Sequence, residues 1–223
     1  MKNTLFPVFL KTENAKFLII GGGNIGLEKT ETLLRQNPDI HLTIVSVSFK
    51  EELLQLVADK PNIKTFQKAY EVSDLSGMDY LVIATNNSEE NRKIKAEANV
   101  AGIKVNAADQ PAICDFYLGS IVNKGYLKIA FSTNGKSPVL ARRLKEYFNE
   151  VIPENIDESI TNLNEIRNQH KGDFVSKVNH LNEVTAVLSG KTGIASKKKE
   201  SIKVIAAFAV GFLLAAILFK LLG

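Results

Sequence analysis

The feature that most constrains the fold is a glycine-rich turn that directly follows an apolar run near the start of the chain. Residues 17–20 are continuously apolar, and they lead into Gly21, Gly23 and Gly26 at G-x-G-x-x-G spacing. A continuous apolar run is typical of a parallel strand covered on both faces. The order of strand, glycine turn and helix therefore predicts an α/β domain with a Rossmann-like parallel sheet.

Each glycine of such a turn has its own task. The first, Gly21, permits the tight turn; the second, Gly23, lets the backbone approach a pyrophosphate; and the third, Gly26, lets the helix and the strand pack closely. The free N–H groups at the start of the following helix attract phosphate oxygens. The turn therefore indicates dinucleotide binding, and the alternative is a glycine turn that only packs.

Behind the turn, strand-like and helix-like segments alternate, which favours parallel strands joined by right-handed helical crossovers. The predicted strands are residues 41–47, 63–66, 79–84 and 103–106. The predicted helices carry Ile25 to Leu34 and cover residues 49–58 and 89–101.

Ligands of an open α/β sheet bind at the carboxyl ends of the strands. We therefore expect the glycine turn to share one crevice with residues 46–48, with the loop that begins at Thr85 and with residues 106–111. An acidic residue commonly ends the second strand and binds the adenosine ribose, but here Val47 and Ser48 stand at that point. The pattern is therefore compatible with NAD and with NADP.

Two polar features are candidates for chemistry beyond cofactor binding. Asp109 is the carboxylate at the tip of the fifth strand, and we interpret it as a proton acceptor or, alternatively, as a turn residue that caps local N–H groups. The loop with Ser132, Thr133 and Ser137 opens a helix whose first turns carry Arg142. It suits an anionic, polycarboxylate ligand, and the alternative is an ordinary capped helix with solvated arginines.

The second half of the chain changes rhythm. Residues 119–123 and 126–132 predict an antiparallel hairpin, and Ser137 followed by Pro138 predicts the start of a helix over residues 139–148. Two polar helical segments follow at about residues 155–169 and 174–188.

The end of the chain has the composition of a membrane span. Residues 204–219 contain no charged residue, and residues 202–222 reach across a bilayer if Lys203 and Lys220 snorkel. A lysine cluster precedes this stretch, so the positive-inside rule places the nucleotide domain in the cytoplasm. We therefore expect a cytoplasmic domain anchored by a C-terminal transmembrane helix, with a buried or interfacial helix as the alternative.

Composition excludes several other classes of function. The net charge of +4 comes with a lysine cluster near residue 199 and no aromatic residues interleaved with a basic stripe, so nucleic-acid binding is not indicated. Cys114 is the single cysteine and is most simply a small buried residue. The three histidines are scattered, which argues against a preformed transition-metal site.

Five motifs of the chain resemble, in order, the precorrin-2 dehydrogenase and sirohydrochlorin ferrochelatase module of siroheme synthases. The resemblance covers about residues 4–150. The motifs are Leu5-Phe6-Pro7-Val8-Phe9-Leu10, Gly21-Gly22-Gly23-Asn24-Ile25-Gly26 followed by Lys29, Ala84-Thr85-Asn86-Asn87, Asn106-Ala107-Ala108-Asp109-Gln110-Pro111, and the run from Ser132 through Ser137-Pro138 to Arg142.

This resemblance implies NAD-dependent oxidation of precorrin-2 to sirohydrochlorin, often followed by insertion of ferrous iron, in a homodimer whose middle segments interlock. By position, Asn24, Ile25, Val47 and Ser48 would contact NAD, and Asp109 would be the acid–base residue of both steps. Ferrous iron is then a substrate, and Asp109 is the one protein group expected near it during insertion. A tetrapyrrole with eight carboxylates would explain the basic groups at the helix that carries Arg142.

We expect two departures from the family pattern: a module without a downstream methyltransferase domain, and a membrane tail that the family does not usually carry. Some members of the family only dehydrogenate. Two other functions stay open, namely a nucleotide-sensing regulatory subunit of a membrane transporter or channel and a membrane-tethered reductase of another substrate.

The resulting domain prediction combines the residue patterns with the resemblance. It has an NAD-binding domain over residues 1–112, a small α+β dimerisation segment over 113–150, a helical segment over 151–188, a linker over 189–201 and a transmembrane helix over 202–222.

Overall fold

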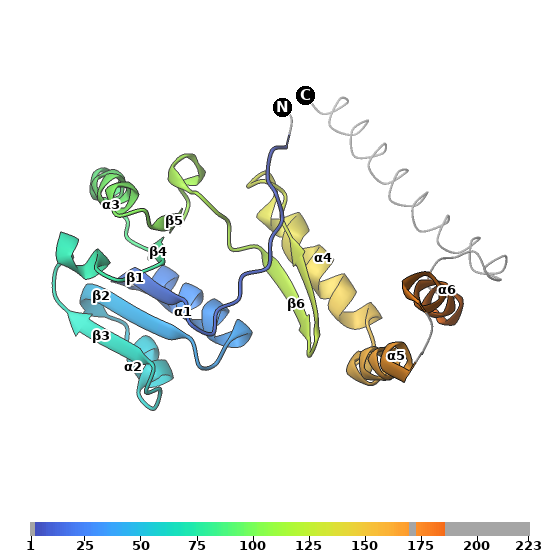
Figure 1. The fold of residues 1–223 in the computed structure, drawn as a ribbon. Coiled ribbons are helices and arrows are strands. Elements are labelled where there is room, and N and C mark those ends of the chain that lie inside the picture. The colour runs from blue at the N-terminus through green and yellow to red at the C-terminus, as the bar shows by residue number, and fades with distance from the viewer. Residues whose placement is uncertain (1–2, 170–172, 186–223) are drawn as a thin grey trace, which may run out of the picture. The chain divides into compact units, whose positions relative to one another are not determined.

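A parallel sheet of five strands forms the core of the first of two compact units (Figure 1). The computed structural model describes residues 3–169 and 173–185. The strand order is β3-β2-β1-β4-β5. The strands are β1 (Lys16–Gly22), β2 (His41–Phe49), β3 (Ile63–Gln67), β4 (Tyr80–Ile83) and β5 (Lys104–Ala107). The predicted Rossmann-like sheet is thereby confirmed.

The register brings the carboxyl ends of neighbouring strands level. Ile20 of β1 pairs with Val45 of β2 on one side and with Ile83 of β4 on the other, and Ile83 pairs with Ala107 of β5. The glycine turn, the end of β2 and the loops after β4 and β5 therefore leave the sheet at the same edge, as the alternation of segments predicts.

Both faces of the sheet are covered, which explains the continuous apolar runs. Helices α1 (Asn24–Gln36) and α2 (Glu51–Val57) pack with Phe17, Ile19 and Ile44 on one face. Helix α3 (Ser88–Val100) and the short 3₁₀ turn η1 (Val72–Leu75) pack with Leu18 and Ile20 on the other. Side chains of successive residues in β1 point to opposite faces, so every position from 17 to 20 is buried.

The structure corrects one element boundary. Residue 49 was predicted to begin a helix, but Phe49 is the last residue of β2 and pairs with Gly22 across a register shift. The amide of Lys50 then donates to the carbonyl oxygen of Gly22 at 2.9 Å. The end of β2 therefore continues alongside the glycine turn, and α2 begins only at Glu51.

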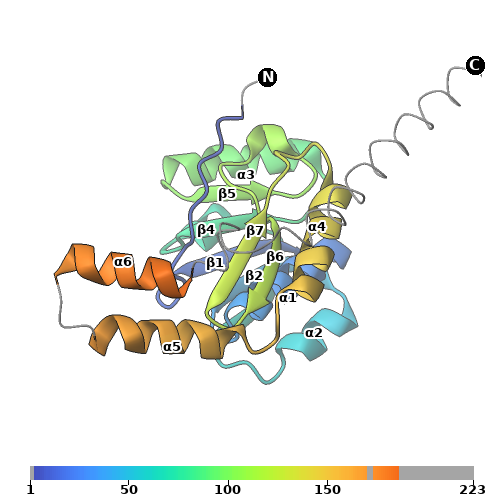
Figure 2. The same ribbon diagram turned by 90° about the vertical axis from the view of Figure 1, so that its right-hand side faces the viewer.

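A hairpin and a long helix follow the sheet in the chain. The 3₁₀ turn η2 (Pro111–Ile113) leads to strands β6 (Ser120–Lys124) and β7 (Leu127–Phe131), which pair antiparallel as predicted. Helix α4 (Pro138–Val151) packs on both strands (Figure 2). Its predicted start is also confirmed, because the Ser137 side chain accepts a hydrogen bond from the amide of Leu140.

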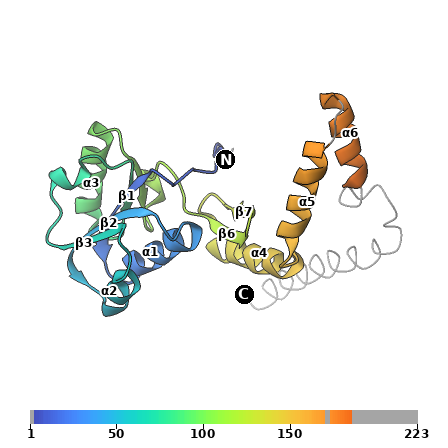
Figure 3. The same ribbon diagram turned by 60° about the horizontal axis from the view of Figure 1, so that its bottom comes forward.

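A second unit begins at Asn155 and contains α5 (Ile156–Gln169) and α6 (Phe174–Val184), which pack against each other (Figure 3). Within the described ranges, no helix has the length and apolar character needed to cross a membrane. The predicted linker and the predicted transmembrane helix over residues 202–222 lie outside those ranges. The finer division of the chain at residues 112 and 150 stays a prediction.

Candidate active site

The glycines of the turn differ in what a side chain would meet. A Cβ on Gly21 would overlap the carbonyl oxygen of Ala84, and Gly21 has a φ of 117°, which disfavours any other residue. A Cβ on Gly26 would overlap the carbonyl oxygen of Gly21. A Cβ on Gly23 would meet no atom within 4 Å. Gly21 and Gly26 thus serve the packing of the turn, whereas Gly23 leaves open space.

The start of α1 has free hydrogen-bond donors beside that open space. Gly23 is the N-cap residue, no side chain caps the helix, and no acidic residue lies in its first turn. The amide groups of the first turn, which include those of Asn24 and Ile25, have no partner within the helix. An uncapped helix start next to an unfilled glycine position fits the pyrophosphate of a dinucleotide.

Ser46, which belongs to the stretch 46–48 expected at the crevice, joins the glycine turn to the end of β2. Its hydroxyl accepts a hydrogen bond from the amide of Gly22 at 2.9 Å and donates one to the carbonyl oxygen of Ser48 at 2.6 Å. The next two residues, Val47 and Ser48, are exposed, as residues that contact a ligand must be. Only the three-dimensional pairing of β1 with β2 reveals this link.

We expect Ser46→Ala to weaken dinucleotide binding by about tenfold, because an unpaired, partly buried amide costs about 1–3 kcal/mol and loosens the turn. The measurement is NAD titration by calorimetry. Thr43→Ala is the matched control, because it also removes a side-chain hydroxyl from β2. Equal NAD affinity in Ser46→Ala and in the control would contradict this role.

Thr85 begins the loop after β4, and its hydroxyl is engaged within the protein. It donates a hydrogen bond to Oδ1 of Asn91 at 2.5 Å, and the Asn91 amide group donates to the carbonyl oxygen of Thr85 at 3.1 Å. Asn91 is completely buried. These two bonds fix the loop against α3.

Asp109 lies in the loop after β5, on the same edge of the sheet as the glycine turn. Its side chain is exposed, and no residue in the described part of the chain donates a hydrogen bond to its carboxylate. The carboxylate therefore caps no N–H group among the described residues. Its backbone has a φ of 58°, a left-handed conformation that is uncommon for a residue with a side chain. Next to it, Gln110 donates a hydrogen bond to the Ser88 hydroxyl at the start of α3.

The residues predicted to bind a polycarboxylate do not lie at the sheet edge with Asp109. A cleft of about 670 Å³ lies between α1, the hairpin and α4, and its lining includes Ser132, Thr133 and Arg142. Ser137 is not part of the lining, and its hydroxyl instead caps α4. The lining contains neither Asp109 nor the glycine turn. The structure therefore groups the predicted site residues into a sheet-edge set and a cleft set.

The charge of the cleft fits an anion. Besides Arg142, the lining holds three basic side chains that the sequence patterns did not assign to a site, Lys29, Arg35 and Lys145, and a single acidic one, Glu28. Arg142 is exposed, and its Nε lies 3.8 Å from the carboxylate of Glu146 on the same helix, a separation typical of a weak surface pair. Its guanidinium is therefore free to bind a carboxylate of a ligand.

The described residues contain no group of three or more histidine, cysteine, aspartate or glutamate side chains placed to hold a metal ion.

Comparison with known proteins identifies the family. A family model described as NAD(P)-binding matches residues 8–120, which is more than half of the chain, and one described as sirohaem biosynthesis protein central matches residues 124–147. The chain belongs to the family of siroheme synthase N-terminal modules. The first match covers the sheet-edge set and the second covers the cleft set.

Individual relatives agree with this family. The chain is 37% identical over 147 residues to siroheme synthase of Nitrosomonas europaea, a match that covers 66% of this chain and 30% of that protein. It is 31% identical over 173 residues to siroheme synthase of Psychrobacter cryohalolentis, covering 78% and 32%. The chain thus spans about a third of the length of these relatives.

A solved structure, that of the precorrin-2 dehydrogenase SirC, has the same fold. It superposes with a TM-score of 0.63 at 24% identity and covers 81% of this chain and 89% of that one. The likeness includes more than the parallel sheet, since 81% of the chain extends beyond residues 8–120.

Proposed function

We propose that this member of the siroheme synthase module family oxidises precorrin-2 to sirohydrochlorin with NAD. The observation that carries the proposal is one sheet edge shared by an open glycine turn at Gly23 and by the Asp109 carboxylate, which has no hydrogen-bond partner among the described residues. A regulatory nucleotide sensor needs the first of these but has no use for the second. The relatives are siroheme synthases, which supports this choice of substrate.

Different residues of the chain would bind the cofactor and accept the proton in this reaction. Bound NAD supplies the acceptor for a hydride. Gly23 and the first turn of α1 would hold the pyrophosphate, and Val47 and Ser48 would contact the adenosine half. Forming the new double bond also requires loss of a proton from the tetrapyrrole, and the Asp109 carboxylate would accept it as a general base.

Asp109 would also serve a second step, in which sirohydrochlorin receives ferrous iron. The macrocycle supplies four nitrogen ligands, so the protein needs no preformed metal cluster. Two pyrrole protons must leave when iron enters, and a positioned carboxylate is a suitable acceptor. Ferrous iron is a substrate of this step, and the product is siroheme.

The cleft would bind the carboxylates of the tetrapyrrole. Ser132 and Thr133 offer hydroxyl groups, and Arg142, Lys29 and Arg35 offer positive charge along its walls. Charged hydrogen bonds of this kind are about twice as strong as neutral ones. The cleft and Asp109 are separate within one chain, so a homodimer with interlocking middle segments would bring the cleft of one subunit to the crevice of the other.

Exposed apolar surface supports the dimer. Phe6 is 84% exposed and Phe9 70% exposed in the N-terminal segment, and Tyr147 and Val151 are exposed on α4. We infer that the partner subunit covers these side chains, because apolar side chains that gather on a protein surface mark contacts with other proteins.

The deciding experiment is turnover of precorrin-2 by the purified chain under anaerobic conditions. With NAD present, we expect NADH absorbance to rise in step with sirohydrochlorin. Adding ferrous iron should then give the siroheme spectrum if the second step is present. No NADH above the level of an enzyme-free control would overturn the proposal, whatever the outcome of NAD titration.

The tail is proposed to anchor the enzyme to the membrane. A chain that ends near residue 196 should stay in the supernatant, dimeric and active, whereas the full chain should sediment with membranes, because residues 204–219 carry no charge. Fractionation followed by immunoblotting measures this. The full chain in the supernatant without detergent would exclude an anchor, and aggregation of the shortened chain would assign the tail to the folded core.

A further inference from the structure

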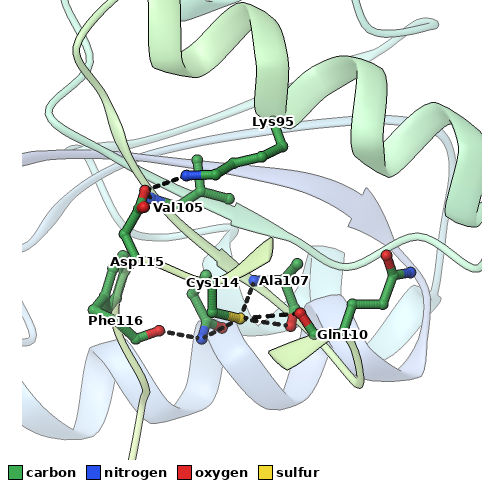
Figure 4. A network of polar contacts seen from close by, with 8 residues as sticks. Lys95, Val105, Ala107, Gln110, Cys114, Asp115 and Phe116 are labelled. Carbon is green, nitrogen blue, oxygen red and sulfur yellow. Dashed lines mark hydrogen bonds and ion pairs between the residues drawn. The ribbon is translucent and has the colours of Figure 1, made fainter. Parts of the chain in front are cut away.

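The chain segment that follows the Asp109 loop turns back and runs beside β5. Strand β5 is the edge strand of the sheet, so the backbone groups of Val105 and Ala107 that point away from β4 have no neighbouring strand. Instead, the residues Cys114 to Phe116 cover this edge (Figure 4). The loop that carries Asp109 is therefore closed at its base by this returning segment.

Asp115 and Phe116 form hydrogen bonds with the middle residues of β5. The amide of Asp115 donates to the carbonyl oxygen of Val105 at 2.7 Å, and the Asp115 carboxylate accepts from the amide of Val105 at 2.9 Å and pairs with Lys95 of α3. The side-chain amide of Asn106 donates to the carbonyl oxygen of Phe116 at 2.9 Å. The two contacts of the Asp115 carboxylate are charge-assisted, and such bonds are stronger than bonds between neutral groups.

Cys114 fastens the end next to Asp109. Its sulfur accepts a hydrogen bond from the amide of Ala107 at 3.2 Å, and its thiol lies 3.2 Å from the carbonyl oxygen of Ala107 and 3.5 Å from that of Gln110. Figure 4 shows the sulfur between these backbone groups. Burial raises the pKa of the thiol, so the thiol keeps the proton that it donates. One side chain thus joins both ends of the turn that contains Asp109.

The turn needs such a fastening because its conformation is unfavourable on its own. A residue with a side chain in a sparsely populated backbone region costs about 1–3 kcal/mol and persists only when its surroundings hold it. Asp109, at a φ of 58°, is such a residue, and the side chain of its neighbour Gln110 bonds only outward to Ser88. Within the turn, the amide of Gln110 makes a long hydrogen bond of 3.4 Å to the carbonyl oxygen of Ala107, and the Cys114 side chain adds contacts to both Ala107 and Gln110.

We propose that Cys114 is a positioning residue, which holds the Asp109 turn by hydrogen bonds to Ala107 and Gln110 and so aims the carboxylate at its substrate. This inference rests on the proposed function for the role of Asp109. The alternative is that Cys114 only fills space beside the core residues of β5, against which it also packs.

Two variants separate these roles. Cys114→Ser keeps a donor and an acceptor but loses volume and apolar character, whereas Cys114→Val is apolar and larger by about one methyl group, suits the extended backbone of residue 114, and cannot form hydrogen bonds. A positioning role predicts that Cys114→Ser keeps amide exchange rates and kcat closer to the wild type than Cys114→Val does. A packing role predicts the reverse order.

The first measurement is amide hydrogen exchange of the full chain, which needs no substrate. In Cys114→Val, the amides of residues 107–113 should exchange about five- to tenfold faster, the effect of one lost hydrogen bond of ordinary net strength, while the amides of β1 stay unchanged. Cys114→Ser should exchange like the wild type. Unchanged exchange in Cys114→Val would overturn the inference.

The second measurement is steady-state turnover of precorrin-2. Cys114→Val should lose about tenfold in kcat through misplacement of the base, with KM and NAD affinity unchanged, and Cys114→Ser should recover most of that loss. A wild-type kcat in Cys114→Val would overturn the inference, and so would a higher kcat in Cys114→Val than in Cys114→Ser. A wild-type chain without turnover would instead contradict the proposed function, and the exchange experiment would still decide whether Cys114 holds the turn.

Discussion

Asp109→Asn should lower precorrin-2 turnover by about 10²–10⁴-fold, the usual contribution of a positioned general base. Asparagine keeps the size and the hydrogen-bonding reach of aspartate but cannot accept the proton. It also tolerates the left-handed backbone found at residue 109, so the turn should keep its conformation. Steady-state kinetics with NADH absorbance measures the loss, and iron insertion into sirohydrochlorin should slow as well.

NAD affinity and the dimeric state should be unchanged in this variant, because the Asp109 carboxylate makes no hydrogen bond within the described residues. Asp59→Asn is the matched control, since it removes one exposed carboxylate after α2, at the opposite edge of the sheet. Wild-type rates of both reactions in Asp109→Asn would return the residue to the role of a turn former and remove the proposed mechanism without affecting the fold.

The sheet was predictable from sequence because its signals are local. Residues 17–20 of β1 are apolar without interruption, and this pattern alone requires cover on both faces. The start of α4 was equally local, since Ser137 and Pro138 are adjacent and together form the cap and the first turn. Signals of this kind do not depend on which segments meet in space.

The boundary of β2 and the fastening residues were not predictable for the opposite reason. Phe49 belongs to a strand only because it pairs with Gly22, which is far away in sequence. The hydroxyl of Ser46 and the thiol of Cys114 act through backbone groups of other segments, and no spacing rule marks a serine or a lone cysteine for that task. Long-range pairing overrides local propensity at each of these positions.

The candidate site shows the same division. The sequence indicated the glycine turn, Asp109 and the loop that starts at Ser132, but it suggested nothing about their separation into a sheet edge and a cleft. The sequence did not indicate that Lys29 and Arg35 line a cleft, because both are charged residues of an ordinary amphipathic helix. They join Arg142 only because the hairpin packs near α1, where Lys128 donates a hydrogen bond to the carbonyl oxygen of Gln36.

The glycine turn allows a clean separation of binding from folding. Gly23→Val should abolish NAD binding, because the side chain would occupy the open space at Gly23 that the pyrophosphate needs. The fold should persist, since a Cβ at this position meets no protein atom within 4 Å and the backbone φ of −82° suits any residue. Titration calorimetry measures binding, and thermal unfolding measures stability.

Gly26→Ala is the contrasting variant in the same turn. Its single methyl group would overlap the carbonyl oxygen of Gly21, a backbone atom that cannot move aside without shifting β1 against α1. Overpacking of this kind costs about 1–3 kcal/mol or more, so this smaller substitution should lower the unfolding temperature more than Gly23→Val does. If Gly23→Val binds NAD with wild-type affinity, the cofactor binds elsewhere, and the position of Asp109 on the same sheet edge no longer supports its role as the base. If instead both variants unfold alike, the open space at Gly23 is filled by the protein itself, and the turn is a packing device.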